Sequence, residues 1–134
     1  MRILLLLLFP LWLTSCSFGA DTKTAEIGVE SFHRDLEAGR YNQIYAAADP
    51  QFKAATTTAD WSKMLGAIHT KLGAYRSGKT VGWTENATTG GKYITLNREA
   101  NYVTGPAQEQ FIFRIDGNKV SLFGYHINSM KFLS

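Results

Sequence analysis

The sequence predicts an α+β domain in which three N-terminal helices pack on a curved, four-stranded antiparallel sheet. Apolar residues recur at intervals of three and four across residues 24–72, which is the spacing of one helix face. From residue 74 onward the pattern changes to β-branched and aromatic residues that alternate with polar ones, which is typical of strands. Helices followed by a run of strands is an α+β order, in which the helices cover one face of the sheet.

A leader precedes this domain. Arg2 is followed by an unbroken apolar run over residues 3–13, and small residues then precede Cys16. A basic residue, an apolar stretch of about ten residues and a small-residue cleavage site are the parts of an export signal. The apolar run is shorter than the roughly 18 residues that a membrane-spanning helix needs. We therefore expect residues 1–15 to be removed.

Leu13-Thr14-Ser15-Cys16 resembles the lipobox of bacterial lipoproteins. The resemblance implies that Cys16 receives a diacylglyceryl group, that cleavage follows Ser15, that the new amino group is acylated and that the protein is anchored in the bacterial envelope. Ser17 differs from the aspartate that retains such proteins at the inner membrane, so the outer membrane, facing the periplasm, is expected. Two other interpretations stay open: ordinary signal-peptidase cleavage after Gly19, and a free or intermolecularly bridged Cys16 thiol.

Composition limits the rest of the chain to one domain of modest charge. Residues 16–23 form a short polar tether, and residues 24–134 suffice for one domain but not for two. Removing Arg2 from the 14 basic residues leaves a net charge of +2 against 11 acidic ones. This balance gives no reason to expect a nucleic-acid partner. Since Cys16 is the only cysteine, the fold must form without an internal disulfide.

Three helices are predicted, over residues 24–38, over residues 41–48 and after a capping hydroxyl at Thr58. Glycine ends the first and third helices at Gly39 and Gly73, and Asp49-Pro50 ends the second. The apolar stripes comprise Ala25, Val29, Phe32 and Leu36 in the first helix, Tyr41, Ile44, Tyr45 and Ala48 in the second, and Trp61, Leu65, Ile68 and Leu72 in the third. These stripes are expected to form the core.

Four strands are predicted, over residues 79–85, 93–103, 108–115 and 119–129. Residues 86–91 form a loop, Gly105-Pro106 turns the chain, and Asp116-Gly117-Asn118 joins the last two strands into a hairpin.

The register of that hairpin stays open. A two-residue turn would group Phe111, Phe113 and Ile115 with Val120 and Leu122, whereas a three-residue loop would group them with Phe123, Tyr125 and Ile127. Gly124 offers a bulge that could switch faces midway along the last strand.

Spaced apolar residues, glycines and one turn resemble those of small secreted bacterial domains of unknown function, which are placed with the cystatin-like, nuclear-transport-factor-2-like fold. The residues are Phe32, Leu36-Glu37-Ala38-Gly39-Arg40-Tyr41, Tyr45, Phe52, Trp61, Leu65, Leu72-Gly73, Phe113-Arg114-Ile115-Asp116-Gly117 and Gly124-Tyr125-His126-Ile127. Asn118-Lys119 departs from the pattern, because such domains frequently carry a tryptophan just after the turn. The resemblance implies a cone between helices and sheet, which relatives use for enzymes, ligand pockets or protein docking alike.

The histidines are the residues from which a catalytic site could be built. His33 and His69 lie beside the apolar stripes of their helices and are expected at the surface. His126, on the last strand, is the one candidate catalytic acid–base residue, of the kind used by related isomerases and hydratases. Arg98 and Glu99 alternate to opposite faces, so both cannot line one pocket with it. No metal-ligand spacing and no phosphate-binding loop occurs, so neither a metal nor a cofactor is expected.

Aromatic residues supply candidates for a binding surface. Trp83, Tyr102 and Tyr125 are candidates for contact with a partner protein or a small apolar ligand, although core packing explains most aromatics in so short a domain. The expected function is therefore a non-enzymatic, lipid-anchored envelope protein that binds a protein or small ligand near the membrane. One alternative is a small anchored isomerase or hydratase that uses His126 in the cone. Another is an inhibitor of an envelope enzyme or an immunity protein.

Overall fold

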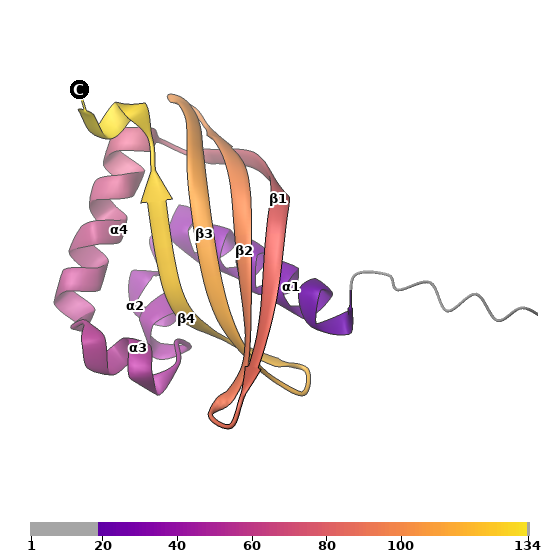
Figure 1. Ribbon diagram of the computed structural model, residues 1–134. Coiled ribbons are helices and arrows are strands. Elements are labelled where there is room, and N and C mark those ends of the chain that lie inside the picture. The colour runs from indigo at the N-terminus through magenta and orange to yellow at the C-terminus, as the bar shows by residue number, and fades with distance from the viewer. Residues whose placement is uncertain (1–18, 134) are drawn as a thin grey trace, which may run out of the picture.

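The computed structural model describes residues 19–133, so the predicted leader and Cys16 lie outside the described residues. Its helices come first and its strands last, which confirms the predicted α+β class (Figure 1). The elements are α1 (Ala20–Glu37), α2 (Tyr41–Ala46), α3 (Pro50–Ala55), α4 (Thr58–Leu72), β1 (Tyr75–Thr88), β2 (Gly91–Tyr102), β3 (Gly105–Asp116), β4 (Lys119–Asn128) and a final 3₁₀ helix (Met130–Leu133). None of these described helices combines the length and the apolar character needed to cross a bilayer.

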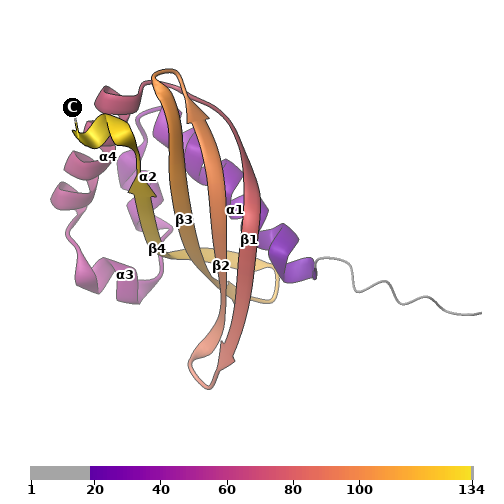
Figure 2. The ribbon, with the colours of Figure 1, turned by 45° about the horizontal axis from the view of Figure 1, so that its top comes forward.

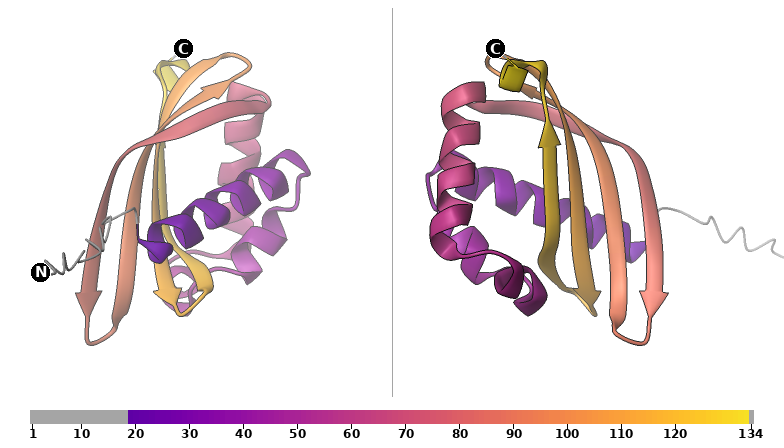
Figure 3. Two further views of the ribbon diagram at one scale, coloured as in Figure 1. Left: turned by 90° about the vertical axis from the view of Figure 1, so that its right-hand side faces the viewer. Right: turned by 60° about the vertical axis from the view of Figure 1, so that its left-hand side comes forward.

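α1 is longer and more deeply buried than its sequence pattern predicts. It begins at Ala20, so residues 20–23 of the predicted tether are helical, and it ends before Gly39, whose φ of 70° suits glycine. The helix lies across one face of the sheet (Figure 3). Its buried face therefore extends beyond the predicted stripe to include Thr22, Gly28 and His33.

Four helices precede the sheet, one more than predicted. Asp49-Pro50 ends α2 but also begins α3, because an Asp49 carboxylate oxygen accepts a hydrogen bond from the Gln51 amide at 2.9 Å. Pro50 occupies the first helical position, where its missing N–H costs nothing. The cap of α4 is Thr57 rather than the predicted Thr58; the Thr57 hydroxyl accepts from the Asp60 amide at 3.1 Å.

The strands form an antiparallel meander in the order β1-β2-β3-β4, so β1 and β4 are the edges (Figures 1 and 2). β1 extends through the first half of the loop predicted at residues 86–91, and β3 begins at Gly105, where a turn was predicted. Burial alternates along β2 and β3. The helices therefore cover one face of a long, curved sheet and leave the other face open.

The β3–β4 hairpin settles the register. Asp116 pairs with Lys119, which gives a two-residue turn and places Leu122 opposite Phe113. A bulge then shifts the register, so that Gly124 pairs with Ile112 and Tyr125 lies opposite Phe111. Of the alternatives that the sequence left open, the structure thus has the two-residue turn together with a bulge beside Gly124, and the bulge brings Tyr125 to the helix-covered side.

α1 approaches the sheet very closely at Gly28. A Cβ atom there would lie 2.8 Å from Phe113 Cε1 and 3.2 Å from Val120 Cγ2. We expect Gly28→Ala to lower the free energy of unfolding by about 1–3 kcal/mol, because the added methyl group overpacks this contact. Gly66→Ala in α4 is the matched control: the nearest atom is 3.8 Å away, so it should stabilise the domain by up to about 1 kcal/mol. Urea denaturation measures both, and stabilisation by both substitutions would contradict the close approach at Gly28.

Candidate functional site

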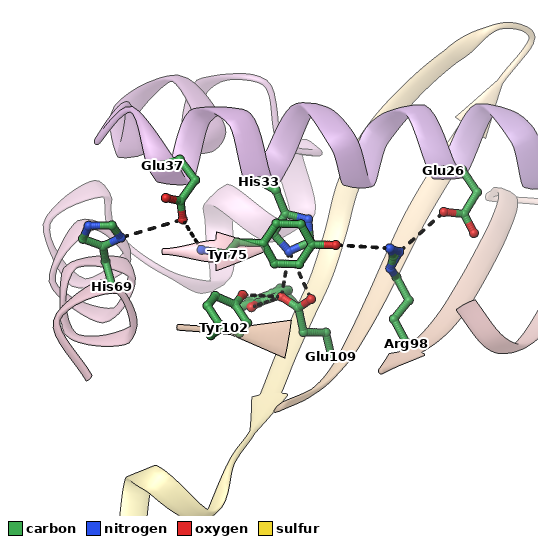
Figure 4. A network of polar contacts seen from close by, with 9 residues as sticks. Glu26, His33, Glu37, His69, Tyr75, Arg98, Tyr102 and Glu109 are labelled. Carbon is green, nitrogen blue, oxygen red and sulfur yellow. Dashed lines mark hydrogen bonds and ion pairs between the residues drawn. The ribbon is translucent and has the colours of Figure 1, made fainter. Parts of the chain in front are cut away.

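The covered side of the sheet contains a polar cluster built around Glu109 of β3 (Figure 4). Its carboxylate accepts hydrogen bonds from Tyr102 Oη at 2.9 Å and Tyr125 Oη at 2.8 Å. His33 Nε2 of α1 lies 3.0 Å from both carboxylate oxygens. The Glu109 side chain has no exposed surface, and the His33 side chain is 5% exposed. Residues from α1, β2, β3 and β4 thus meet at one buried carboxylate.

The electrostatics of the cluster favour an ionised Glu109. Burial alone would raise the pKa of Glu109, but the hydrogen bond and charge of His33 and the hydrogen bonds of Tyr125 and Tyr102 lower it below its ordinary value of 4.5. Since an ionised carboxylate only accepts, His33 Nε2 carries the shared proton. Burial, and then the charge of Glu109, raises the pKa of both Tyr102 and Tyr125, which keeps both phenols protonated as donors.

A second layer joins this cluster to the edge of the sheet. The Tyr75 ring stacks on the His33 ring with centroids 3.6 Å apart and planes within 5°. Arg98 Nη2 lies 3.4 Å from Tyr75 Oη, and Arg98 Nη1 lies 3.6 Å from a Glu26 carboxylate oxygen. Thr80 donates a short hydrogen bond to Glu26. Figure 4 shows Arg98 between Tyr75 and Glu26, with dashed lines to both.

This cluster has the residue types of an acid–base site, but its surroundings are closed. Phe32 and Phe111 pack against Tyr125 with ring centroids 4.6 and 4.9 Å away. A cavity of about 80 Å³ lies between α1 and the β3–β4 hairpin, and its lining does not include His33 or Glu109. With its carboxylate buried and bonded to side chains of α1, β2 and β4, Glu109 is suited to holding α1 on the sheet.

The open face of the sheet carries a hollow of about 440 Å³. Its polar lining comes from β2, β3 and β4 and comprises Asn97, Arg98, Glu99, Gln108, Gln110, His126 and Asn128, of which Arg98 is buried. Glu109 also borders this hollow, but its carboxylate points to the covered side and has no exposed surface. Gln110 Nε2 donates to Asn97 Oδ1 at 3.0 Å. Amides and a carboxylate at a solvent-exposed surface can hydrogen-bond a polar ligand or a protein.

A groove of about 470 Å³ lies between α4 and β4. Its apolar lining consists of Met64, Ala67 and Ile68 from α4, Tyr125 and Ile127 from β4, and Phe132 from the last helix. Lys71 and His126 supply its polar groups. His126 and Ile127 border both the groove and the open-face hollow, so the two depressions adjoin at β4.

The structure places the catalytic candidate on the open face of the sheet. His126 is exposed and pairs with Gln110 there, so the alternative that put His126 between the helices and the sheet is wrong. The reason is the bulge, which sends Tyr125 to the covered side and its neighbour His126 to the opposite one. Within residues 19–133, no hydrogen bond or ion pair links His126 to a carboxylate. Arg98 and Glu99 do lie on opposite faces, as predicted.

Of the three aromatic candidates, two are buried and one is exposed. Tyr102 and Tyr125 are 3% and 7% exposed and donate to Glu109, so both belong to the covered cluster, and Tyr125 also borders the groove between α4 and β4. Trp83 lies opposite Leu96 at the β1 edge and is 41% exposed, which leaves it accessible to a partner. Cys16, the predicted lipid-attachment residue, lies outside the described residues.

Sequence reasoning missed the residues at the centre of the cluster. His33 was expected at the surface, but it is 4% exposed, because α1 buries a face wider than its apolar stripe. Glu109 drew no attention in the sequence, although it alternates in step with Ala107, Phe111 and Phe113, and that charged position in an apolar alternation was the available signal. His69 is partly exposed, with Nδ1 3.9 Å from Glu37.

No three His, Cys, Asp or Glu side chains in the described part of the chain gather closely enough to hold a metal ion. In comparison with known families, residues 29–125 match the model described as "Protein of unknown function (DUF4019)". A search of curated proteins gives no match.

Proposed function

The chain belongs to the DUF4019 family of proteins of unknown function, so its role must come from its own residues, and we propose that it is a non-enzymatic binding protein of the bacterial envelope, anchored by lipid at Cys16. Its single domain binds a protein partner or a small ligand next to the membrane. The observation that carries this proposal is the closed interior: the acid–base residues on the covered side are bonded to one another and inaccessible. The accessible depressions lie on the outside of the sheet and along β4.

The enzyme alternative requires His126 to act in a site that excludes water. In the open-face hollow His126 shares its surroundings with Glu99, but the hollow faces solvent, and within residues 19–133 no hydrogen bond or ion pair orients the imidazole. General acid–base catalysis needs a positioned proton donor or acceptor. A binding role requires only accessible side chains, which is why the geometry favours it.

Anchoring would hold the binding surface close to the bilayer. Three residues separate Cys16 from Ala20, the first residue of α1. A chain of this length spans at most about 14 Å. A lipid on Cys16 would therefore leave the domain little freedom, and its partner would be a membrane neighbour.

We also assign the fold to the cystatin-like, nuclear-transport-factor-2-like group as part of this proposal. A long α1 across a curved, four-stranded antiparallel meander supports the assignment. This architecture serves catalysis and binding alike, so the fold by itself does not choose between them.

Photo-cross-linking in intact cells tests the binding role. Benzoylphenylalanine replaces Gln110 in the open-face hollow, Ala67 in the groove, or Glu30 on the exposed side of α1 as the control. We expect a discrete cross-linked species from Gln110 or Ala67 and none from Glu30. The absence of any such species from the first two positions, with the protein folded and in place, would contradict the proposal.

A further inference from the structure

Four side-chain amides converge on the hollow in the open face of the sheet. The right-hand view of Figure 3 shows this face, with α1 behind the sheet. Asn97 belongs to β2, Gln108 and Gln110 belong to β3, and Asn128 belongs to β4. Asn97 lies opposite Gln110 in the sheet, and Asn128 lies opposite Gln108. The volume of about 440 Å³ is in the range of ordinary ligand sites, which runs from about 300 to 1,000 Å³.

One hydrogen bond orients two of these amides. Gln110 Nε2 donates to Asn97 Oδ1 at 3.0 Å, and in the described part of the chain no other hydrogen bond occupies Asn97 Nδ2 or Gln110 Oε1. A donor and an acceptor therefore remain side by side on neighbouring strands. A secondary amide of a ligand can accept from Asn97 with its C=O group and donate to Gln110 with its N–H group. A sugar with an acetamido group presents such an amide.

The fixed charges around the hollow are balanced or lie on the other side of the sheet. Glu99 borders the hollow, and its carboxylate lies 3.9 Å from Lys79. The Glu109 carboxylate is buried on the covered side, where the buried Arg98 guanidinium contacts Tyr75. A ligand charge would therefore gain little here. An uncharged ligand with many hydrogen-bonding groups suits this surface better.

Apolar surface lies beside the amides. Val81 is 56% exposed at an irregularity of β1 and borders the hollow. Tyr93 shares a face with Asn97, four residues or about 13 Å away along β2, because alternate residues of a strand point to the same side. The Tyr93 and Phe123 rings lie there with centroids 4.8 Å apart. The C–H groups of a sugar ring pack on aliphatic groups and on the negative faces of aromatic rings, while its hydroxyl groups bond to amides.

We propose that the open face binds an oligosaccharide that carries acetamido groups, with one sugar in the hollow and the others extending toward Tyr93 and Phe123. Asn97 and Gln110 hold the acetamido group, and the remaining amides bond to hydroxyl groups. A peptide suits this face less well, because the main-chain groups of β2 and β3 are already bonded within the sheet. This assignment rests on the binding role and names its site and the class of ligand.

Titration of the full-length protein with chitotetraose, an oligomer of N-acetylglucosamine, tests the site by two-dimensional proton–nitrogen NMR spectroscopy. The detergent must have a headgroup that is not a sugar. We expect chitotetraose to shift the side-chain amide signals of Asn97 and Gln110. Cellotetraose has hydroxyl groups in place of the acetamido groups, so it should bind at least about tenfold more weakly, for the loss of one or two hydrogen bonds.

Two glutamine variants provide the matched comparison. Gln110→Ala removes the acceptor and the bond that orients Asn97, so it should weaken chitotetraose binding at least about tenfold. Gln43→Ala removes the same kind of side chain from an exposed position of α2 and should leave binding unchanged. The spectra also show whether each variant is folded.

Equal binding of chitotetraose to Gln110→Ala and to the natural chain would overturn the proposal, as would equal binding of the two saccharides or no binding of either. So would shifts at this face that come instead from the neutral peptide N-acetyl-trialanine methylamide, or from association of two copies as the protein concentration rises. A protein cross-linked from Ala67, with no saccharide bound in the hollow, would preserve the binding role and reject this ligand.

Discussion

Glu109→Ala should lower the free energy of unfolding by about 3–5 kcal/mol, the cost of breaking a buried, hydrogen-bonded charge pair from one side. The substitution leaves His33, Tyr102 and Tyr125 without the acceptor that all three share. A buried donor that loses its hydrogen-bond acceptor still bears the free-energy cost of its removal from water. Urea denaturation followed by tryptophan fluorescence measures the change.

Glu99→Ala is the control for that experiment. Glu99 lies on the opposite face of the sheet with its side chain 60% exposed, 3.9 Å from an exposed Lys79. Exposed pairs of this kind contribute little, so the change should stay within about 0.5 kcal/mol. Similar effects of the two substitutions would contradict a structural role for the Glu109 cluster.

Cys16→Ser should move the protein from the membrane fraction to the soluble fraction. A serine at this position offers no sulfur for lipid attachment, and stable anchoring requires more than one acyl chain or a second membrane signal. Metabolic labelling with a radioactive fatty acid, followed by fractionation, measures both consequences. Uptake of label by the Cys16→Ser chain, or a soluble and unlabelled natural chain, would contradict the lipid anchor.

Ser17→Asp supplies the matched control for the anchor. By the lipoprotein resemblance, aspartate after the lipidated cysteine retains the protein at the inner membrane. This variant should therefore take up as much label as the natural chain and fractionate with the inner membrane. Unchanged sorting with full labelling would leave the anchor intact and contradict only the expected outer-membrane location.

The class of fold could be predicted from the sequence because its signals are local. Gly39 and Gly73 mark the ends of two helices. The spacing of apolar residues, which is helical along residues 24–72 and alternating beyond them, marks where helices give way to strands. α3 was missed because Asp49-Pro50 serves as both an end and a beginning, and six residues hold too few turns to show a period. The middle of β1 was predicted as a strand over residues 79–85, but its two ends were missed because they are largely exposed at an edge and show little apolar alternation.

The buried cluster could not be predicted because it depends on contacts between distant segments. His33 and Glu109 are separated by 76 positions, and only the packing of α1 across the sheet brings them to 3.0 Å. The faces of Tyr125 and His126 depended on a bulge that the sequence offered as one of several alternatives. Local patterns thus predicted the layer of helices and the sheet. Which side chains meet between them depended on strand register and on the packing of α1.

The absence of catalysis at the covered side is the claim on which the proposed function depends, and Glu109→Gln tests it most directly. Glutamine keeps the size of the side chain and one acceptor oxygen but removes the negative charge and the capacity to act as a base. In cells kept at a temperature where this variant stays folded, we expect cross-linking from Gln110 or Ala67 to persist at the natural level, together with complementation of a strain that lacks the gene. A folded, anchored Glu109→Gln protein that still captures its partner but fails to complement would show that the buried carboxylate performs chemistry.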